Sequence, residues 1–225
     1  MDYQNYNSSI KRKGAPPLGI RDVKLNYIVE TATALFIERS IRGVTVRDIA
    51  EKAEVGEATV YRYFARKQTI VQSAAEKLQA EVLGHYYRAM PGKSGAERLA
   101  AFYEVYPRVF REHPEFYRFV REFDGYLISE GLSSSEEYAA GIDKFYDYFI
   151  TAYRGGVADG SVREQEDPRL FYYATAHAML ELCKKLSVAG DLVRQDSAVA
   201  RAAEIDELKR VILRSLLIEP QNPNK

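Results

Sequence analysis

Residues 57–64 concentrate hydroxyl, phenol and guanidinium groups on one short segment with the sequence Glu-Ala-Thr-Val-Tyr-Arg-Tyr-Phe. At helical spacing, Val60 and Phe64 fall four residues apart on one face, which predicts that they point inward. The side chains left on or near the outer face are Thr59, Tyr61, Arg62 and Tyr63. Such groups can form hydrogen bonds with phosphates and base edges, so a short helix that carries them can enter the major groove of DNA.

Another short helix is predicted directly before residues 57–64, and it is needed to hold the outer-face helix in place. Thr45 can cap it by accepting a backbone N–H bond, and Asp48 suits the positive end of its first turn. Ala50 and Ala53 allow the two helices to approach closely, and Gly56 lies in the short turn between them. The segment is therefore predicted to be a helix-turn-helix, whose first helix crosses the DNA backbone above the second.

Apolar periodicity predicts helices along the rest of the chain, about nine in all, and no convincing strand. The other expected helices span approximately 22–42, 67–87, 96–113, 115–129, 135–158, 168–188 and 197–218. Ser134 with Glu137 predicts a capping box, and Asp167 before Pro168 predicts an N-cap. The fold class is therefore all-α, with an N-terminal three-helix unit followed by a larger helical part.

Charge is distributed unevenly along the sequence, although the 225 residues hold 32 basic and 32 acidic residues. Residues 1–67 contain 12 basic and 8 acidic residues, so the remainder is acidic. A basic N-terminal segment is compatible with nucleic acid, and a net charge of zero does not exclude such a partner. A solvated face is the alternative explanation. The basic cluster Lys11-Arg12-Lys13 lies in residues 1–20, which have the composition of a disordered arm.

The composition excludes several other classes of protein. No stretch approaches the roughly 18 uncharged apolar residues of a membrane helix, and the first 24 residues contain no signal-like apolar run. Cys183 is the only cysteine, so an internal disulfide is impossible and a reducing cytoplasm is the expected compartment.

Enzymatic chemistry has little support in the sequence. His85, His113 and His177 are on different predicted helices without metal-type spacing, and Cys183 lies in an apolar helix that suits a small core residue. The acidic pair Glu136 and Glu137 complements a helix start. Phosphate-binding loops and nucleophile elbows do not occur. We therefore expect neither enzymatic activity nor a metal or other cofactor.

Three stretches within residues 24–67 resemble the DNA-binding domain of the TetR/AcrR family of transcriptional regulators. They are Ala-Leu-Phe at 34–36, Val-Arg-Asp-Ile-Ala at 46–50, and Thr-Val-Tyr-Arg-Tyr-Phe at 59–64, with Lys67 just after. The rest of the chain resembles the family only in plan, as a helical body of suitable length. The resemblance implies a regulator, most often a repressor, that binds a palindromic operator in double-stranded DNA as a homodimer and is released by a small hydrophobic or aromatic effector.

The resemblance also implies which residues contact bases or phosphates, namely Thr45, Arg47, Thr59, Tyr61, Tyr63 and Lys67. The chain departs from the common Ser-Lys-Gly pattern at Gly56, Glu57 and Ala58, so a helix cap and a cation are missing. Glu57 repels phosphate, but it can accept a hydrogen bond from cytosine N4; a solvent-facing glutamate is the alternative. Arg62 can bind phosphate or a guanine edge, or its stem can cover apolar surface.

Aromatic residues are concentrated in the body, where 15 lie between Phe102 and Tyr153. Such stripes usually form core, but buried tyrosine hydroxyls need partners, and rings with a few polar groups can line a ligand cavity. The resembled family holds such a cavity, and binding there re-spaces the two DNA-reading units. The hypothetical lining residues are Tyr106, Phe110, Phe123, Tyr126, Tyr146, Phe149 and His177.

Two stripes on the last two predicted helices could pair with their twins as a four-helix bundle across a two-fold axis, as in the resembled family. The first consists of Phe171, Ala174, Thr175, Ala178 and Leu182, and the second of Leu208, Val211, Ile212, Ser215 and Leu216. The alternative is that both stripes pack within one subunit. The expected organisation is a basic arm at 1–20, a helix-turn-helix domain at 21–67 and a ligand-binding and dimerisation domain at 68–225.

One function from a different class stays open at this point. The chain could be a helical ligand-binding or partner-binding protein whose N-terminal unit does not read specific DNA. Glu57 and the small basic excess of residues 1–67 are the features that favour it.

Overall fold

A computed structural model describes residues 19–88, 94–188 and 199–218 of the chain. Within these ranges the chain is all-α, as predicted, and the one β-type contact is an isolated antiparallel bridge between Val162 and Leu217. Its helices are α1 (Ile20–Arg39), α2 (Val46–Lys52), α3 (Glu57–Tyr63), α4 (Lys67–Arg88), α5 (Gly95–Glu112), α6 (Pro114–Glu130), α7 (Glu136–Ala158), α8 (Pro168–Leu186) and α9 (Arg201–Leu216). The predicted basic arm with Lys11, Arg12 and Lys13 lies outside the described residues.

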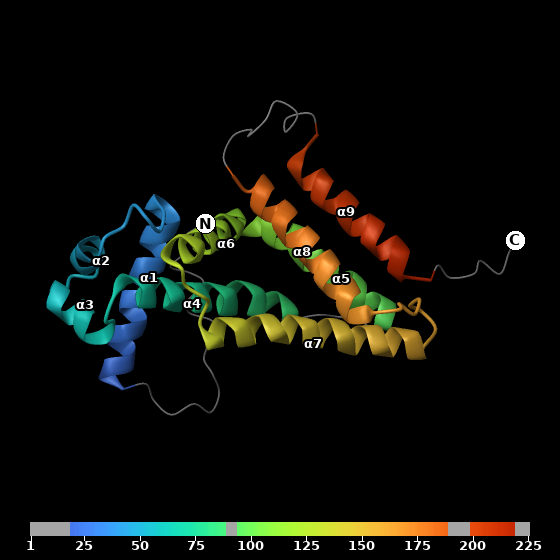
Figure 1. Cartoon of the computed structure of the whole chain (residues 1–225), viewed down its shortest axis with the longest axis horizontal. Coiled ribbons are helices and arrows are strands. Elements are labelled where there is room, and N and C mark those ends of the chain that lie inside the picture. Colours follow the sequence, from blue (N-terminus) through green and yellow to red (C-terminus); the bar gives the residue numbers. More distant parts are fainter. Residues whose placement is uncertain (1–18, 89–93, 189–198, 219–225) are drawn as a thin grey trace, which may run out of the picture.

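Helices α1 to α3, here called the head, form one end of the molecule (Figure 1). The predicted inner face of α1 is buried, since Ile28, Ala32, Leu35 and Phe36 are at most 2% exposed. Ile49 on α2 is also fully buried, because it closes the same small core. The head is therefore built from the apolar spacing that the sequence displays.

Helices α4 to α9, here called the body, extend away from the head (Figure 1). Helix α4 runs from the head along α7, and α8 and α9 lie side by side at the far end. Helices α5 and α7 approach closely where Gly95 faces Gly156, because a β-carbon at Gly95 would lie 2.1 Å from the Gly156 nitrogen. Two glycines at this crossing let the backbones meet directly.

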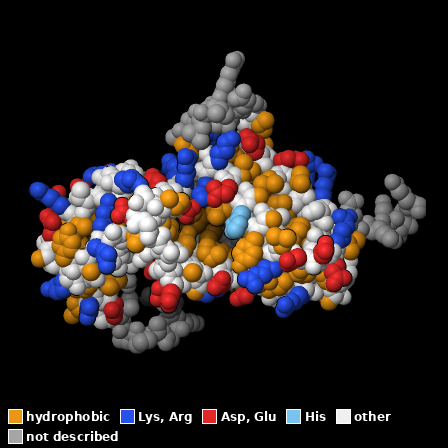
Figure 2. All heavy atoms as spheres, in the orientation of Figure 1, with side chains coloured by type: hydrophobic (Ala, Val, Ile, Leu, Met, Phe, Trp, Pro, Cys, Tyr) orange, Lys and Arg blue, Asp and Glu red, His pale blue; other side chains and the backbone are white. Residues whose placement is uncertain are grey.

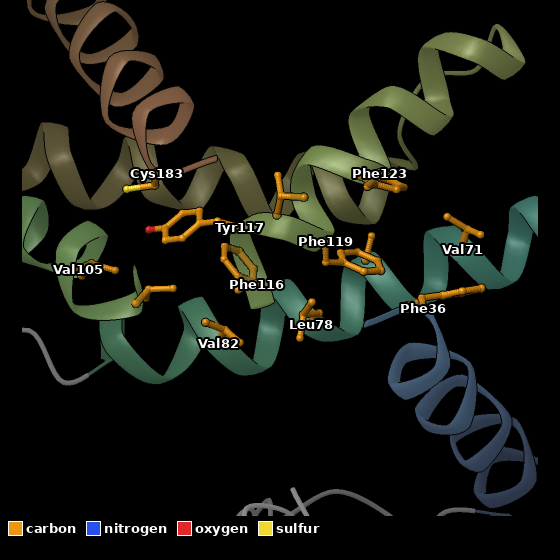
Figure 3. Packing of buried hydrophobic residues seen from close by; sticks show 14 of the residues in the cluster. Phe36, Val71, Leu78, Val82, Val105, Phe116, Tyr117, Phe119, Phe123 and Cys183 are labelled. Carbon is orange, nitrogen blue, oxygen red and sulfur yellow. The ribbon is translucent and has the colours of Figure 1, made fainter. Parts of the chain in front are cut away.

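A continuous apolar core joins head and body. Figure 3 shows Phe36 of α1 near Val71 of α4, with Leu78 and Val82 further along the same helix. Aromatic rings of α6, including Phe116 and Phe119, pack over α4. Helix α4 is therefore a shared element, with one end in each part of the molecule.

The helix starts test two of the predicted caps. The Asp167 side chain accepts hydrogen bonds from the backbone nitrogens of Arg169 and Leu170, which confirms the predicted N-cap. The prediction for Ser134 was wrong, because the cap of α7 is Ser135, whose hydroxyl accepts from the Tyr138 nitrogen and donates to Glu76 at 2.5 Å. The bond to Glu76 on α4 is a tertiary contact that fixes the register of the turn.

Candidate nucleic-acid interface and body cavity

Helix α3 presents a polar outer face on an apolar base. Val60 is 0% exposed and Phe64 is 3% exposed, so both point into the head as their spacing predicts. Tyr61 is 51% exposed and Arg62 is exposed, while Thr59 and Tyr63 are half-buried. The outer face therefore offers hydroxyl, phenol and guanidinium groups to a partner outside the protein.

Arg62 and Tyr63 form a preorganised pair on this face. The Arg62 guanidinium carbon lies 5.5 Å from the centre of the Tyr63 ring, within the range of a cation–π contact. The contact holds a positive charge at the C-terminal end of α3. Both roles considered for Arg62 are compatible with this contact. The side chain covers an aromatic ring, and its exposed guanidinium group is still available to a phosphate or a guanine edge.

Thr45 and Asp48 cap α2 reciprocally. The Asp48 nitrogen donates to Thr45 Oγ1 at 3.1 Å, and the Thr45 nitrogen donates to Asp48 Oδ2 at 2.7 Å. The hydrogen bonds from Thr45 hold the pKa of the Asp48 carboxyl below its usual value. The predicted cap is confirmed, and it fixes the start of the helix that supports α3.

Arg47 projects from α2 beside Glu51. Its Nε lies 2.8 Å from Glu51 Oε1, and the two side chains are 74% and 62% exposed. The hydrogen bond with Glu51 raises the pKa of Arg47, which stays charged in any case. An exposed pair of this kind is weak, so the guanidinium can exchange Glu51 for another anion at small cost.

The turn between α2 and α3 contains Gly56, as predicted from the sequence. The residue with left-handed backbone is Glu54, with φ of 54°, whereas Gly56 has φ of −72° and is the N-cap of α3. Gly56 therefore supplies neither a positive φ nor a capping side chain. A non-glycine residue in the left-handed region is strained, which marks Glu54 as a weak point of the turn.

Glu57, Ala58 and Lys67 complete the predicted interface. Glu57 and Ala58 are exposed at the N-terminal end of α3, where the carboxylate complements the helix dipole. Lys67 starts α4 and is half-buried, and this burial lowers the pKa of its ammonium group. Every residue predicted to contact DNA thus has some exposed surface on the α2–α4 segment of the protein.

An apolar cavity of about 130 Å³ lies within the body. Figure 2 shows a hollow lined by hydrophobic side chains near the middle of one face, with a histidine at its rim. The lining residues are Gln79 and Leu83 of α4, Val105 and Tyr106 of α5, Phe116, Tyr117 and Val120 of α6, Tyr138, Ile142 and Phe145 of α7, and Tyr172, Tyr173, Ala176, His177 and Leu180 of α8. Helices α4 to α8 therefore all contribute to the wall.

Of the seven residues predicted from sequence to line a pocket, Tyr106 and His177 are in this lining. Three others are not lining residues but lie next to one. The distances between ring centres are 6.4 Å for Phe110 and Tyr117, 5.1 Å for Phe123 and Tyr138, and 5.2 Å for Tyr146 and Tyr172.

The remaining two predicted residues, Phe149 and Tyr126, are buried. Phe149 is 0% exposed and surrounded by aromatic rings, and Tyr126 is 7% exposed; neither is among the lining residues. Two of the seven predicted residues therefore line the cavity, and the other five lie behind its lining or elsewhere in the core.

Sequence reasoning missed Gln79, although the sequence contains a signal for it. Ala75, Gln79 and Val82 fall at i, i+4 and i+7 on the inner side of α4, so Gln79 is a polar residue within an apolar stripe. A polar side chain in such a position is unusual and points to a specific role.

The residues predicted to form a dimer interface differ in their exposure within one subunit. Ala174, Ala178, Val211 and Ser215 are exposed, whereas Ile212 is 5% exposed and Leu216 is 0% exposed within one subunit. The half-buried members are Phe171, Thr175, Leu182 and Leu208. Thr175 forms a hydrogen bond of 2.6 Å with Tyr103 of α5, which is a contact inside the subunit.

Cys183 is the one cysteine of the chain, and it is buried in the body. Burial raises the pKa of the Cys183 thiol to about 12, so Cys183 is a neutral core residue at physiological pH. Among the described residues, no group of His, Cys, Asp and Glu side chains could hold a metal ion. Among the described helices, none combines the length and the apolar character needed to cross a membrane.

A helix-turn-helix with an exposed second helix, carried on an all-helical body, defines a DNA-binding regulator. The sequence model of the tetR family of bacterial regulatory proteins matches residues 28–74. Residues 28–74 therefore have the sequence of a TetR-family DNA-binding region, the kind of region found in transcriptional regulators.

Individual relatives agree with this assignment. The chain is 24% identical over 147 residues to the HTH-type transcriptional repressor KstR2 of Rhodococcus jostii, a match that covers 64% of this chain and 71% of that protein. The ketosteroid transcriptional regulator KstR2 of Mycobacterium tuberculosis has a similar fold, with a TM-score of 0.57, 18% identity and coverage of 91% of this chain and 99% of that one.

A transcriptional-regulator structure from Saccharomonospora viridis, solved in complex with choline, superimposes with a TM-score of 0.69. It shares 18% identity over 87% of this chain and 98% of its own. At this identity the likeness concerns the fold, so the ligand of that protein says nothing direct about the cavity described above.

Proposed function

We propose that this regulator is a repressor that binds a palindromic operator as a homodimer and is released by a small hydrophobic or aromatic effector. The observation that carries the proposal is the outer face of α3, where Tyr61 and Arg62 are exposed above the buried Val60 in a TetR-family head. Such a face is suited to base edges and phosphates in a major groove.

Dimerisation follows from the size of the recognition helix. Helix α3 has 7 residues and can contact only a few base pairs, so specific binding calls for two heads about 34 Å apart. The outer sides of α8 and α9 are the surface proposed for the pairing. Leu170 is 65% exposed and Val211 is 53% exposed there, and Ala174 and Ala178 leave room for a second backbone.

The effector is proposed to bind in the body cavity, and two helices support a link from there to the head. Helix α4 lines the cavity with Gln79 and begins at Lys67 beside α3. Helix α6 lines it with Tyr117, and its Glu122 accepts a hydrogen bond of 2.8 Å from the Ile41 backbone nitrogen just after α1. An effector that displaces either helix would therefore move the head.

Selection of bound fragments from a random DNA pool by the full chain tests the proposal. A palindrome with half-sites about one helical turn apart is expected, and its binding should weaken steeply with salt. Tyr61→Ala should lower the affinity about 10- to 100-fold, since one base-edge contact is worth about 1–3 kcal/mol. Tyr148→Ala removes a tyrosine that is 37% exposed on α7 and should leave the affinity unchanged.

Three results would contradict parts of the proposal. A pool without any sequence preference would support the alternative of a helical binding protein whose head does not read DNA. A monomeric mass by light scattering at working concentration would contradict the dimer. DNA that stays bound when the cavity is occupied would contradict release by an effector.

A further inference from the structure

We infer that the body cavity selects uncharged, single-ring molecules with a hydrogen-bond acceptor such as a ketone oxygen, and that the Gln79 carboxamide donates to this acceptor. The inference rests on the effector part of the proposed function, because it names the chemistry of the molecule bound there. It concerns binding to the body alone, so it can be tested without DNA.

The carboxamide of Gln79 is a buried donor without a partner. The residue is only 6% exposed and lines the cavity, and its Nε2 has no hydrogen-bond partner among the described residues. Buried polar groups are nearly always paired, because an unpaired donor loses its bonds to water without replacement. An acceptor on a bound molecule would supply the missing partner.

The absence of a side chain at Gly141 of α7 makes room for this amide. A β-carbon at Gly141 would lie 1.9 Å from Gln79 Oε1 and 2.8 Å from its side-chain carbonyl carbon. Glycine in the interior of a helix is less favourable than alanine, so its presence there calls for a packing reason. The reason is that the Gln79 carboxamide occupies the volume where a β-carbon would stand.

The rest of the lining favours an uncharged ligand. The described residues that line the cavity include no Asp, Glu, Lys or Arg, so an ion inside it would lose its hydration without gaining a counter-charge. Aromatic rings can bind a cation. The amide hydrogens of Gln79 carry partial positive charge, however, so they favour a ligand with a hydrogen-bond acceptor over a cation.

The volume of the cavity sets the size of the ligand. It holds about 130 Å³, close to the roughly 150 Å³ of an engineered apolar cavity that binds benzene. One six-membered ring with a small substituent therefore fits without rearrangement of the helices.

Two probes of the same shape isolate the hydrogen bond. Cyclohexanone carries a carbonyl oxygen, and methylenecyclohexane replaces this oxygen by an apolar CH₂ group. Binding of each to the full chain without DNA is measured by NMR titration. The wild type should bind cyclohexanone about 5- to 100-fold more tightly, the range expected when a buried donor gains its only partner.

Three variants show whether Gln79 is the cause. Gln79→Met keeps the length of the side chain, lacks the donor and should abolish the preference for the ketone. Gly141→Ala leaves Gln79 in place but pushes the flexible end of its side chain aside, so it should reduce the preference. Gln72→Met is the matched control, because the Gln72 amide of the same helix donates to the Ser133 carbonyl oxygen at 3.0 Å, outside the cavity lining.

The possible results divide clearly. A ketone preference that is present in the wild type and in Gln72→Met, and lost in Gln79→Met, supports the inference. Equal binding of both probes, a preference that survives in Gln79→Met, or no binding of either probe would each overturn it. None of these results depends on whether the head binds an operator, so the proposed DNA-binding function is judged separately.

Discussion

The hydrogen bond between Tyr103 and Thr175 connects α5 to α8 inside one subunit. Removing the Tyr103 hydroxyl and removing the Thr175 hydroxyl should lower the free energy of unfolding by different amounts. Thr175 Oγ1 donates to the Phe171 carbonyl oxygen at 2.7 Å, so the Tyr103 phenol must donate to Thr175 Oγ1 at 2.6 Å. Tyr103 is 0% exposed, and this burial raises the pKa of its phenol. The phenol therefore depends on Thr175 for its hydrogen bond.

The expected costs follow from which group loses its partner. Tyr103→Phe removes the donor and leaves Thr175 bonded to its own helix, so the loss should be about 0.5–1.5 kcal/mol. Thr175→Val keeps the side-chain shape but leaves the buried phenol unpaired, which should cost about 1–3 kcal/mol. For a chain of this length each kcal/mol lowers the melting temperature by about 2–4 °C.

Urea unfolding of the two single variants and the double variant measures these costs. The double variant should be no less stable than Thr175→Val, because it contains no unpaired phenol. Thr31→Val is the matched control: Thr31 donates to the Tyr27 carbonyl oxygen of its own helix at 2.9 Å, and its loss should change stability by less than about 0.5 kcal/mol.

A Thr175→Val variant that is as stable as Tyr103→Phe, or more stable, would refute the reasoning about the unpaired phenol. A change of oligomeric mass in Thr175→Val without a loss of stability would place Thr175 in the dimer interface instead. Light scattering beside the unfolding experiment separates these two roles.

Two further predictions concern the head. Glu54→Gly should raise the free energy of unfolding by up to about 1 kcal/mol in thermal or urea unfolding, because Glu54 has a left-handed φ of 54° that glycine adopts without strain; a fall in stability would show that the Glu54 side chain makes a net contribution. The pKa of Asp48 is lowered by hydrogen bonds from Thr45, so the stability that Asp48 adds is present above its unfolded pKa of about 3.9 and is lost as the pH falls through the lower folded pKa. The wild type should therefore exceed Asp48→Asn in stability at pH 7 and lose this advantage as the pH falls below the unfolded pKa and through the lower folded pKa; a gap that persists in strong acid would contradict this account.

The elements of the fold could be predicted because local spacing determines them. Val60 and Phe64 are buried in the structure because they are one helical turn apart on a short amphipathic helix. Thr45 and Asp167 cap their helices because the side chains reach backbone N–H groups two or three residues ahead. These interactions involve near neighbours in the chain, so the sequence alone contains them.

The composition of the cavity was decided by the tertiary structure. An aromatic stripe shows which side of a helix is apolar, but it does not show whether that side meets another helix or a space between helices. Phe149 therefore lies in the core, whereas Tyr106 and His177 reach the cavity. The Gln79 carboxamide occupies space left by Gly141, which is 62 residues away along the chain.

The same limit applies to the surfaces of α8 and α9. Their sequences contain the apolar stripes, but only the packed structure shows that Leu216 is buried within the subunit and that Val211 faces outward. The sequence by itself determined the helices, their caps and the polar outer face of α3, because each depends on contacts within about one turn. The folded chain decided the cavity, the unpaired Gln79 donor and the free sides of α8 and α9, because each depends on helices that meet only after folding.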